Sequence, residues 1–377
     1  MKKGLLLLLI FHVFMICRTY AQCNGFPYLC DRTYDDVAYL TTHNAFNDAT
    51  DGFLLPNQNN TITQQLNDGV RALMIDVYDV NGVATVYHGF SYLGNAPLTD
   101  KLDEIKAFLY NNPQEIVTLI LENYASPALV ETALSQSGLL SYLFVKDTTT
   151  ILWPTLQQMI NSGKRLVIFS EADDATPSQP WYHYVWDYAV ETNFTVHDTS
   201  EFNCSYNRGN PDNPLFIFNH FITDATLGIG VEAQATMANA NPYLLNRIYD
   251  CMNIHNKFPN FITVDFYERG DSKAAVDIIN SGYWAGIQSP ETTSDNISIG
   301  PNPCRELLNV EVKEPVRGKG LYLQLTNLFG QEIFYTEIKQ QHISLDLSNV
   351  KSGGIYFVKI SSSLNNSCST RKIVVLR

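Results

Sequence analysis

Residues 72–80 read ALMIDVYDV, and residues 116–124 read IVTLILENY. Both are nearly continuous runs of apolar residues that turn polar toward their carboxyl ends. A strand of a parallel sheet is buried on both faces and carries such a run, whereas a strand with one wet face alternates apolar and polar residues. The two runs therefore predict parallel strands at the centre of an α/β fold.

Similar runs flank these two on both sides. Further strands are expected at 37–43, 84–88, 165–170, 215–221 and 261–267. Helical patterns lie between them at 99–112, where Thr99 is the expected cap, and at 242–255 and 272–279. Repeated strand–helix units favour an α/β barrel or a doubly wound sheet. No glycine-rich phosphate loop follows a strand, which argues against nucleotide binding.

Polar side chains stand at the carboxyl ends of nearly all the predicted strands. They are His43, Asn44, Asp76, Asp79, His88, Glu122, Asn123, Asn219, His220 and Asp265. In a parallel barrel these ends meet at one face, where barrel enzymes keep their active sites. A single such residue is more often a structural hydrogen-bonding group. A polar end on almost every strand instead predicts a reactive site.

The pattern changes after about residue 290. A polar, linker-like stretch at 289–296 precedes short segments that alternate with period two. These segments lie at 321–325, 332–336, 342–347, 355–360 and 372–376. We expect a small all-β sandwich over 297–377 without a catalytic cluster, behind a main domain over 22–290.

Composition limits the classes of partner. The 377 residues include 45% hydrophobic and 17% charged residues, ample for a core, and carry a net charge of −13. Binding to nucleic acid needs clustered Lys and Arg, so we expect no nucleic-acid partner. The same charge argues against a basic surface for anionic membranes.

The first residues predict export. Lys2 and Lys3 precede an apolar run at 5–16, and 19–21 form a small-x-small cleavage site, so 1–21 is expected to be a signal peptide. The alternative is a membrane anchor, for which the run is short. Six cysteines follow: Cys23, Cys30, Cys204, Cys251, Cys304 and Cys368. An even number in an exported chain indicates disulfides, with Cys23–Cys30 favoured by proximity and the other pairings open. A zinc site is the rival interpretation, but no CxxC pair or His cluster supports it.

Several motifs of the main domain resemble the X domain of phosphatidylinositol-specific phospholipases C. They are THNA at 42–45, GVRALMIDVYD at 69–79, YHG at 87–89, IVTLILENY at 116–124 and FITVDFY at 261–267. The opening CNG and LCD at 23–31 resemble the secreted branch found in plants, fungi and bacteria. The resemblance covers about 22–285. It implies a TIM barrel and a phosphodiesterase.

The tail resembles the C-terminal sorting domain of the type IX (Por) secretion system. The matching motifs are PNP at 301–303, TNLFGQ at 326–331, LDLS at 345–348, GIYFVKI at 354–360 and KIVV at 372–375. This implies the type IX machinery as a partner and a secreted or cell-surface location. A carbohydrate- or surface-binding β-module is the alternative.

The family resemblance implies three catalytic roles. His43 would be the general base that takes the proton from the inositol 2-hydroxyl, which then attacks phosphorus to form a cyclic phosphate. Asp265 would hold that imidazole in the correct tautomer. His88 would stabilise charge on the phosphoryl oxygens and assist the leaving group.

The resemblance also implies a metal site. The calcium-dependent branch uses ligands that match Asn44, Asp76 and Glu122, while Met74 occupies a fourth ligand position and cannot bind calcium well. We expect Ca²⁺, or alternatively Mg²⁺, with weakened affinity. The metal-independent branch places an Arg near the phosphate, and the sequence has none at the equivalent position.

The substrate is expected to be a phospholipid or glycolipid at a membrane surface, bound by a monomer. The polar residues expected to contact it are Arg71, Lys164, Asn219 and Tyr267. The family uses basic residues at the end of the strand at 165–170, which here is followed by Glu171. Two alternatives stay open. One is a glycerophosphodiester phosphodiesterase or phospholipase D-like barrel, and the other is a degenerate inositol- or glycan-binding module.

Overall fold

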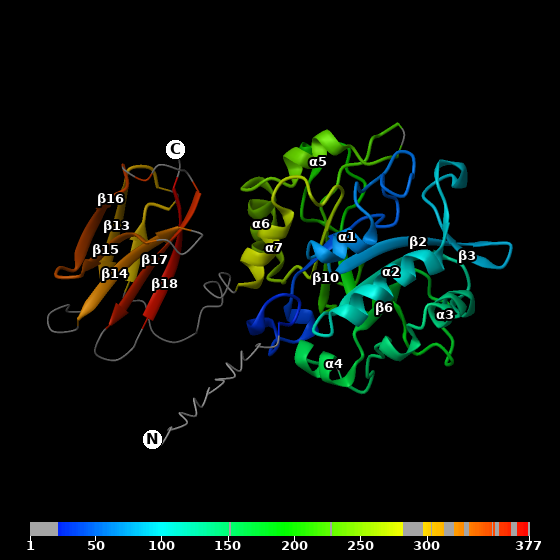
Figure 1. The fold of residues 1–377 in the computed structure, drawn as a ribbon. Helices are drawn as coiled ribbons and strands as arrows, with labels where there is room; N and C mark the ends of the chain where they lie inside the picture. Colours follow the sequence, from blue (N-terminus) through cyan, green and yellow to red (C-terminus); the bar gives the residue numbers. More distant parts are fainter. Residues whose placement is uncertain are drawn as a thin grey trace, which may run out of the picture. The chain divides into compact units, whose positions relative to one another are not determined.

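The computed structural model describes residues 22–150, 152–226, 228–281, 297–302, 304–312, 320–327, 332–348, 350, 354–362 and 368–375. The predicted signal peptide at 1–21 and the predicted linker at 289–296 lie outside these residues. The chain divides into two compact units, Met1–Val276 and Asp277–Arg377, which are described separately (Figure 1).

The first unit is built on one curved sheet in the order β7-β6-β5-β2-β1-β11-β10-β8, in which every neighbouring pair is parallel. The strands are β1 (Tyr39–Thr42), β2 (Ala72–Val80), β5 (Val117–Tyr124), β6 (Leu166–Ser170), β7 (Tyr182–Tyr184), β8 (Ala189–Thr192), β10 (Leu215–Asn219) and β11 (Phe261–Val264). Within the described residues no ladder joins β7 to β8, so the barrel is open at that seam. The α/β TIM-barrel class is confirmed.

The strand expected at 84–88 is not a barrel strand. β3 (Val83–Val86) pairs antiparallel with β2, and β4 (Ala96–Pro97) pairs with β3. Asn81 and Gly82 both have positive φ, 54° and 80°, which is the backbone of a tight hairpin turn. The chain therefore folds back on β2 before His88 instead of crossing to a new strand. A further antiparallel strand, β9 (Tyr206–Gly209), pairs with β8.

The helices of the first unit lie on the outer side of the sheet (Figure 1). They are α1 (Ile62–Asn67), α2 (Leu98–Asn111), α3 (Pro127–Gln136), α4 (Leu156–Ser162), α5 (Glu232–Ala238), α6 (Tyr243–His255) and α7 (Ser272–Asn280). The helices expected at 99–112, 242–255 and 272–279 are present within a residue or so at each end. The expected Thr99 cap is wrong, because α2 starts at Leu98 and Pro97 occupies the N-cap position.

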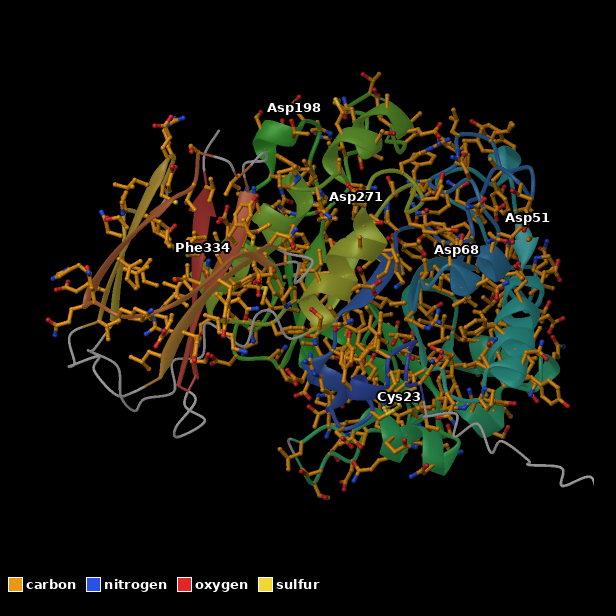
Figure 2. All side chains as sticks on the ribbon, turned by 60° about the vertical axis from the view of Figure 1, so that its left-hand side comes forward. Cys23, Asp51, Asp68, Asp198, Asp271 and Phe334 are labelled. Atoms are coloured by element: carbon orange, nitrogen blue, oxygen red, sulfur yellow. A yellow bond between two sulfur atoms is a disulfide. The ribbon has the colours of Figure 1, made fainter. Side chains whose placement is uncertain are left out.

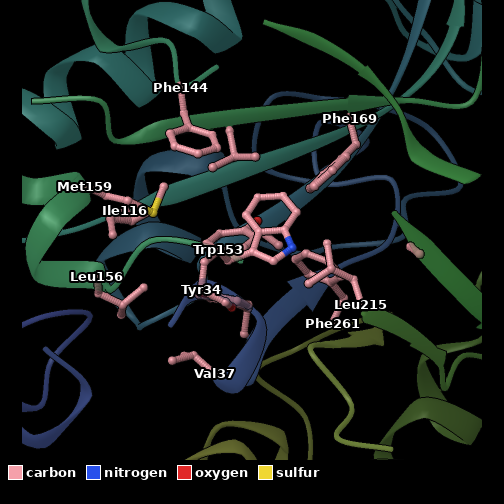
Figure 3. Packing of buried hydrophobic residues seen from close by; sticks show 14 of the residues in the cluster. Tyr34, Val37, Ile116, Phe144, Trp153, Leu156, Met159, Phe169, Leu215 and Phe261 are labelled. Carbon is pink, nitrogen blue, oxygen red and sulfur yellow. The ribbon is translucent and has the colours of Figure 1, made fainter. Parts of the chain in front are cut away.

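A cluster of aromatic and aliphatic side chains fills the amino-terminal end of the barrel (Figure 3). Trp153 lies at its centre, with its ring 4.9 Å from that of Tyr34. Leu215 and Phe261, the first residues of β10 and β11, are fully buried in the same cluster. The opposite, carboxyl-terminal end is thereby left for the polar residues, as in other barrels.

Two disulfides tie down the first unit. Cys23–Cys30, the expected pair, closes the segment that leads into the barrel. Cys204–Cys251 links the segment before β9 to α6. Cys304 of the second unit is buried and not disulfide-bonded.

The second unit is a two-sheet β structure, as expected. Its strands are β12 (Ile297–Gly300), β13 (Leu307–Val312) and β16 (His342–Asp346) in one antiparallel sheet, and β15 (Glu332–Glu337), β14 (Leu321–Asn327), β17 (Gly354–Ser362) and β18 (Cys368–Val375) in the other. Leu308 and Val310 of the first sheet share a core with Leu323 and Val358 of the second. A core formed between two antiparallel sheets defines a sandwich.

Across the described residues of both units, every helix is too short or too polar to cross a membrane.

Candidate active site

The carboxyl ends of the barrel strands surround a cavity of about 460 Å³. Its polar lining residues are His43, Asn44, Asp76, Glu122, Asn123, Glu171, Glu191, Arg208 and Asn219. They come from β2, β5, β8, β9 and β10 and from the residues that follow β1 and β6. The prediction that polar strand ends meet at one face is therefore correct for most of these positions.

His43 is held by a buried carboxylate. Its Nδ1 lies 2.9 Å from Oδ1 of Asp265, a residue 222 positions away and only 1% exposed. On its other side the imidazole stacks on Phe221, with the ring centroids 3.9 Å apart. Because Asp265 occupies Nδ1, the nitrogen available for proton transfer is Nε2. This is the arrangement of a general base with an orienting carboxylate.

Asn57 positions this pair and was not predicted. Its Nδ2 donates to both oxygens of Asp265, at 3.2 and 3.1 Å, while its Oδ1 accepts from Asn44 and Asn47. Gly230 packs on the same group, since a Cβ there would stand 2.7 Å from Asp265 Oδ2. Asn57 lies in a polar loop with no pattern of its own, so no sequence signal indicates its role.

His88 is held by a second carboxylate. Its Nδ1 is 3.0 Å from Asp76 Oδ2, and its ring centroid is 6.4 Å from that of His43. Burial alone would lower the pKa of His88, but the hydrogen bond and charge of Asp76, together with Glu122, raise it above the usual value. This shift of the pKa is in the direction that suits a proton donor. The β2–β3 hairpin brings His88 there.

The three predicted metal ligands line the same cavity. Asp76 and Glu122 are direct register partners on β2 and β5, so their carboxylates stand side by side, and Asn44 follows β1. Burial and the charge of Glu122 raise the pKa of Asp76, and the His88 hydrogen bond opposes that shift. Within the described residues no group of three or more His, Cys, Asp or Glu side chains is placed to hold a metal. Two carboxylates and one amide remain a donor set whose chemistry fits Ca²⁺ or Mg²⁺.

An arginine that no sequence motif indicates enters the cavity from β9. Arg208 donates from Nε to Glu191 Oε1 at 2.5 Å, and from its two terminal nitrogens to Glu171 at 2.5 and 3.0 Å. Its guanidinium also lies over Trp186 and Phe194, 4.4 and 4.8 Å from their ring centroids. The two carboxylates raise the pKa of Arg208 although burial lowers it. This cation is therefore fixed in place and largely neutralised.

Asn219 is the one predicted substrate-binding residue that reaches the cavity, where it donates to Glu191 Oε2 at 2.9 Å. Tyr267 is buried away from it and donates to Asp68 at 2.6 Å.

The structure does not support the substrate roles expected of Arg71 and Lys164. Both stand just before their strands, at the amino-terminal end of the barrel. Arg71 pairs with Glu115 at 2.8 Å, and Lys164 donates to the Ser141 carbonyl at 3.0 Å. A residue before a parallel strand lies at the end opposite to the residues after it, so neither can contact a ligand in the cavity.

The remaining polar strand ends are structural. His220 is fully buried, accepts from Arg247 and donates to the Ala238 carbonyl. Asp79 accepts from the Gly82 amide in the hairpin turn.

A barrel with two carboxylate-held histidines over an acidic cavity matches a known class. The "PI-PLC X 1" family model matches residues 29–280, so the chain belongs to the PI-PLC X domain family. The "Secretion system C-terminal sorting domain" model matches residues 298–376, which marks the protein for export.

Two relatives illustrate the range of this family. A PI-PLC X domain-containing protein of Arabidopsis thaliana is 31% identical over 280 residues, which is 68% of this chain and 62% of that protein. PI-PLC X domain-containing protein 1 of Arthroderma benhamiae is 29% identical over 273 residues, 68% of this chain and 89% of that protein. The chain thus spans less than two thirds of the Arabidopsis relative.

Solved structures show weaker likenesses. A mutant of the phosphatidylinositol-specific phospholipase C from Staphylococcus aureus has a TM-score of 0.46 and 14% identity, over 66% of this chain and 94% of that chain. L. pealei PLC21 has a TM-score of 0.44 and 11% identity, over 91% and 52%. The strand order and the family match, and not these scores, establish the fold.

Proposed function

We propose that this exported barrel is a phosphoric diester hydrolase or lyase of the phospholipase C type. It cleaves the phosphodiester of an inositol phospholipid or glycolipid anchor and forms a cyclic phosphate. The observation that carries the proposal is a pair of histidines whose ring centroids lie 6.4 Å apart, each bonded through Nδ1 to its own carboxylate. His43 lines the cavity, and His88 is bonded to Asp76, which lines it. One pair supplies a base and the other an acid.

The proposed reaction assigns one step to each histidine. Nε2 of His43 takes the proton of the inositol 2-hydroxyl, and that oxygen attacks phosphorus. The bond from phosphorus to the lipid oxygen breaks, and protonated His88 gives its proton to the leaving alkoxide. The products are a cyclic inositol phosphate and a lipid alcohol such as diacylglycerol. Asp265 keeps His43 in the required tautomer and stabilises the imidazolium that forms.

A divalent cation at Asn44, Asp76 and Glu122 is part of the proposal. When bound, Ca²⁺ or Mg²⁺ would neutralise charge on the phosphoryl oxygens. The paired carboxylates of Asp76 and Glu122 support this, because a protonated His88 offsets only one of their two negative charges, and like charges side by side are costly. Arg208 does not relieve them, since it is bonded to Glu171 and Glu191.

The partners belong to the same proposal. We expect a monomer that acts on a membrane phospholipid or glycolipid and is exported by the type IX machinery.

Turnover of phosphatidylinositol by the purified full chain tests the function. His43→Ala should lower kcat by about 10²- to 10⁴-fold, because it removes the general base. His342→Ala is the matched control, since His342 is an exposed histidine of the second unit and should leave kcat unchanged. Equal activity of the two variants would contradict the role of His43. Binding of inositol or glycan without any turnover would favour the degenerate binding module instead.

A further inference from the structure

Helix α6 directs three side chains of one face toward the segment that leads into β9. Arg247, Cys251 and His255 are spaced by four residues, so they lie one above another along the helix. Cys251 forms the disulfide with Cys204, and Nε2 of His255 donates to the Cys204 carbonyl. We call Arg247, Cys251 and His255 the α6 clamp.

The α6 clamp holds the chain at further points on either side of the disulfide. Arg247 donates to the Asn203 carbonyl at 2.9 Å, and the ring of His255 stacks on that of Tyr206, with the centroids 3.9 Å apart. The other terminal nitrogen of Arg247 donates to the carbonyl of Asn219 at 2.9 Å. Because Asn219 ends β10 and lines the cavity, the clamp joins the segment before β9 to the site.

The sheet holds β9 by a short ladder. Among the described strands β9 is the last of the sheet on its side, and it pairs with β8. Two register pairs form this ladder, Val190 with Gly209 and Thr192 with Tyr206, and the register shifts between them. A segment with so few ladder contacts has low local stability, so the position of β9 depends on what else is attached to it.

Arg208 is the residue that β9 contributes to the cavity. It is bonded to Glu171 and Glu191, and its guanidinium lies over Phe194, which are three other lining residues. Arg208 is four residues after Cys204, and four residues of chain span at most about 14 Å. A movement of the chain at the disulfide is therefore passed to this wall of the cavity.

We propose that the three residues of the α6 clamp are positioning residues for substrate binding. Through the disulfide and the contacts beside it they hold β9, so that Arg208 forms a fixed wall of the cavity. The importance of that wall for a substrate rests on the proposed function. His43 and His88 follow other strands, β1 and β3, so a displaced β9 leaves them in place. Loss of the clamp therefore weakens substrate and transition state alike and raises KM without lowering kcat.

A reductant opens the clamp without changing the sequence. Cys204 is half-buried, whereas Cys23 and Cys30 of the other disulfide are 0% and 7% exposed. Thiol–disulfide exchange needs access to a sulfur, so dithiothreitol should attack the Cys204–Cys251 bond first. The two thiols of the reagent pass two electrons and two protons to Cys204 and Cys251, and the reagent closes to its own cyclic disulfide.

Hydrogen–deuterium exchange and steady-state kinetics of the full chain test the proposal together. In Cys204→Ser with Cys251→Ser the amides of β9 should exchange roughly 10-fold faster, because β9 loses its covalent attachment to α6. The KM for a soluble inositol phosphodiester should rise by roughly 10-fold, the worth of one hydrogen bond to a charged group, with kcat within about twofold. Dithiothreitol should produce the same changes in the parent chain, and its removal in air should reverse them.

Cys23→Ser with Cys30→Ser is the matched control, because it removes the disulfide at the amino-terminal end of the barrel. Figure 2 shows Cys23 and Asp198, which belongs to the segment between β8 and β9, at opposite ends of the first unit. This variant should keep the parent KM and the parent exchange rates of β9. Thermal unfolding midpoints check that each variant is folded. If the clamp variant does not fold, His255→Ala, which keeps the disulfide, should show smaller changes of the same kind.

Several outcomes would overturn the proposal. They are unchanged exchange of β9 with an unchanged KM, equal rises of KM in the two cysteine variants, or a fall of kcat at constant KM in the clamp variant. Faster exchange of β9 without turnover by any variant or the parent chain would remove the proposed function and leave the clamp standing. Turnover by the parent chain with the same KM in every variant would do the reverse.

Discussion

The positioning role of Asn57 is a prediction that no sequence motif suggests. Asn57→Leu removes both hydrogen bonds to the carboxylate of Asp265, at 3.2 and 3.1 Å, and Asp265 is only 1% exposed. It also removes the bonds that Asn57 accepts from Asn44 and Asn47. Each hydrogen bond to a charged group contributes about 1.5–3 kcal/mol. Without these bonds Asp265 can turn away from His43. If the transition state is thereby destabilised by the free energy of one such bond, kcat falls roughly 10- to 100-fold.

The assay is steady-state kinetics on a soluble inositol phosphodiester, with kcat and KM determined separately. We expect kcat to fall with little change in KM, since Asn57 does not line the cavity. Asn59→Leu is the control, because Asn59 lies in the same loop and donates to Glu232 and Glu268 instead. A kcat of Asn57→Leu within twofold of the parent value, or equal losses in both variants, would refute the reasoning.

Three further predictions concern the metal, the pH dependence of stability and the tail. Chelation should abolish most turnover and Ca²⁺ should restore it. In direct binding measurements Met74→Glu should tighten the binding of Ca²⁺, and Asp76→Ala should weaken it severely. Full turnover in excess chelator would refute the requirement for a metal. Burial and the neighbouring Arg247 lower the pKa of His220 to about 3 in the folded state, so below about pH 6.5 only the unfolded chain takes up its proton. The unfolding free energy should then fall by up to about 1.4 kcal/mol per pH unit as the pH is lowered toward 3, and it should fall less steeply in His220→Gln. Urea titrations at several pH values measure the two slopes, and equal slopes would contradict the prediction. Deleting the chain from about residue 297 should stop its secretion and leave the barrel active, and normal secretion of the truncated chain would be the contrary result.

The sequence predicted the parts of the fold that repeat a strong pattern. β2 and β5 are long aliphatic runs, and their carboxyl ends carry Asp76 and Glu122 in register. β7, β8 and β9 are short and contain His183, Glu191 and Arg208, so none of them forms the apolar run by which the equally short β1 and β11 could be recognised. The hairpin after β2 was missed because Val83–Val86 is apolar like a barrel strand, although Asn81-Gly82 is a turn signal that could have revealed it.

The same distinction separates the site residues that could be predicted from those that could not. His43 and Asp265 could be predicted because each ends a barrel strand, and β1 pairs with β11 in register. Arg208 and Asn57 could not, because they reach the site from an antiparallel strand and a polar loop whose positions depend on the whole fold. Arg71 and Lys164 were proposed for their charge, although their place just before a strand puts them at the amino-terminal end of the barrel.

The identity of the phosphorus product tests the central claim most directly. We propose following phosphatidylinositol cleavage by the full chain with ³¹P NMR from the first turnovers. The mechanism with His43 as base and the 2-hydroxyl as nucleophile predicts a cyclic inositol phosphate as the first product, which His43→Ala fails to form. Direct appearance of an acyclic phosphate monoester, or of phosphatidic acid, would contradict it.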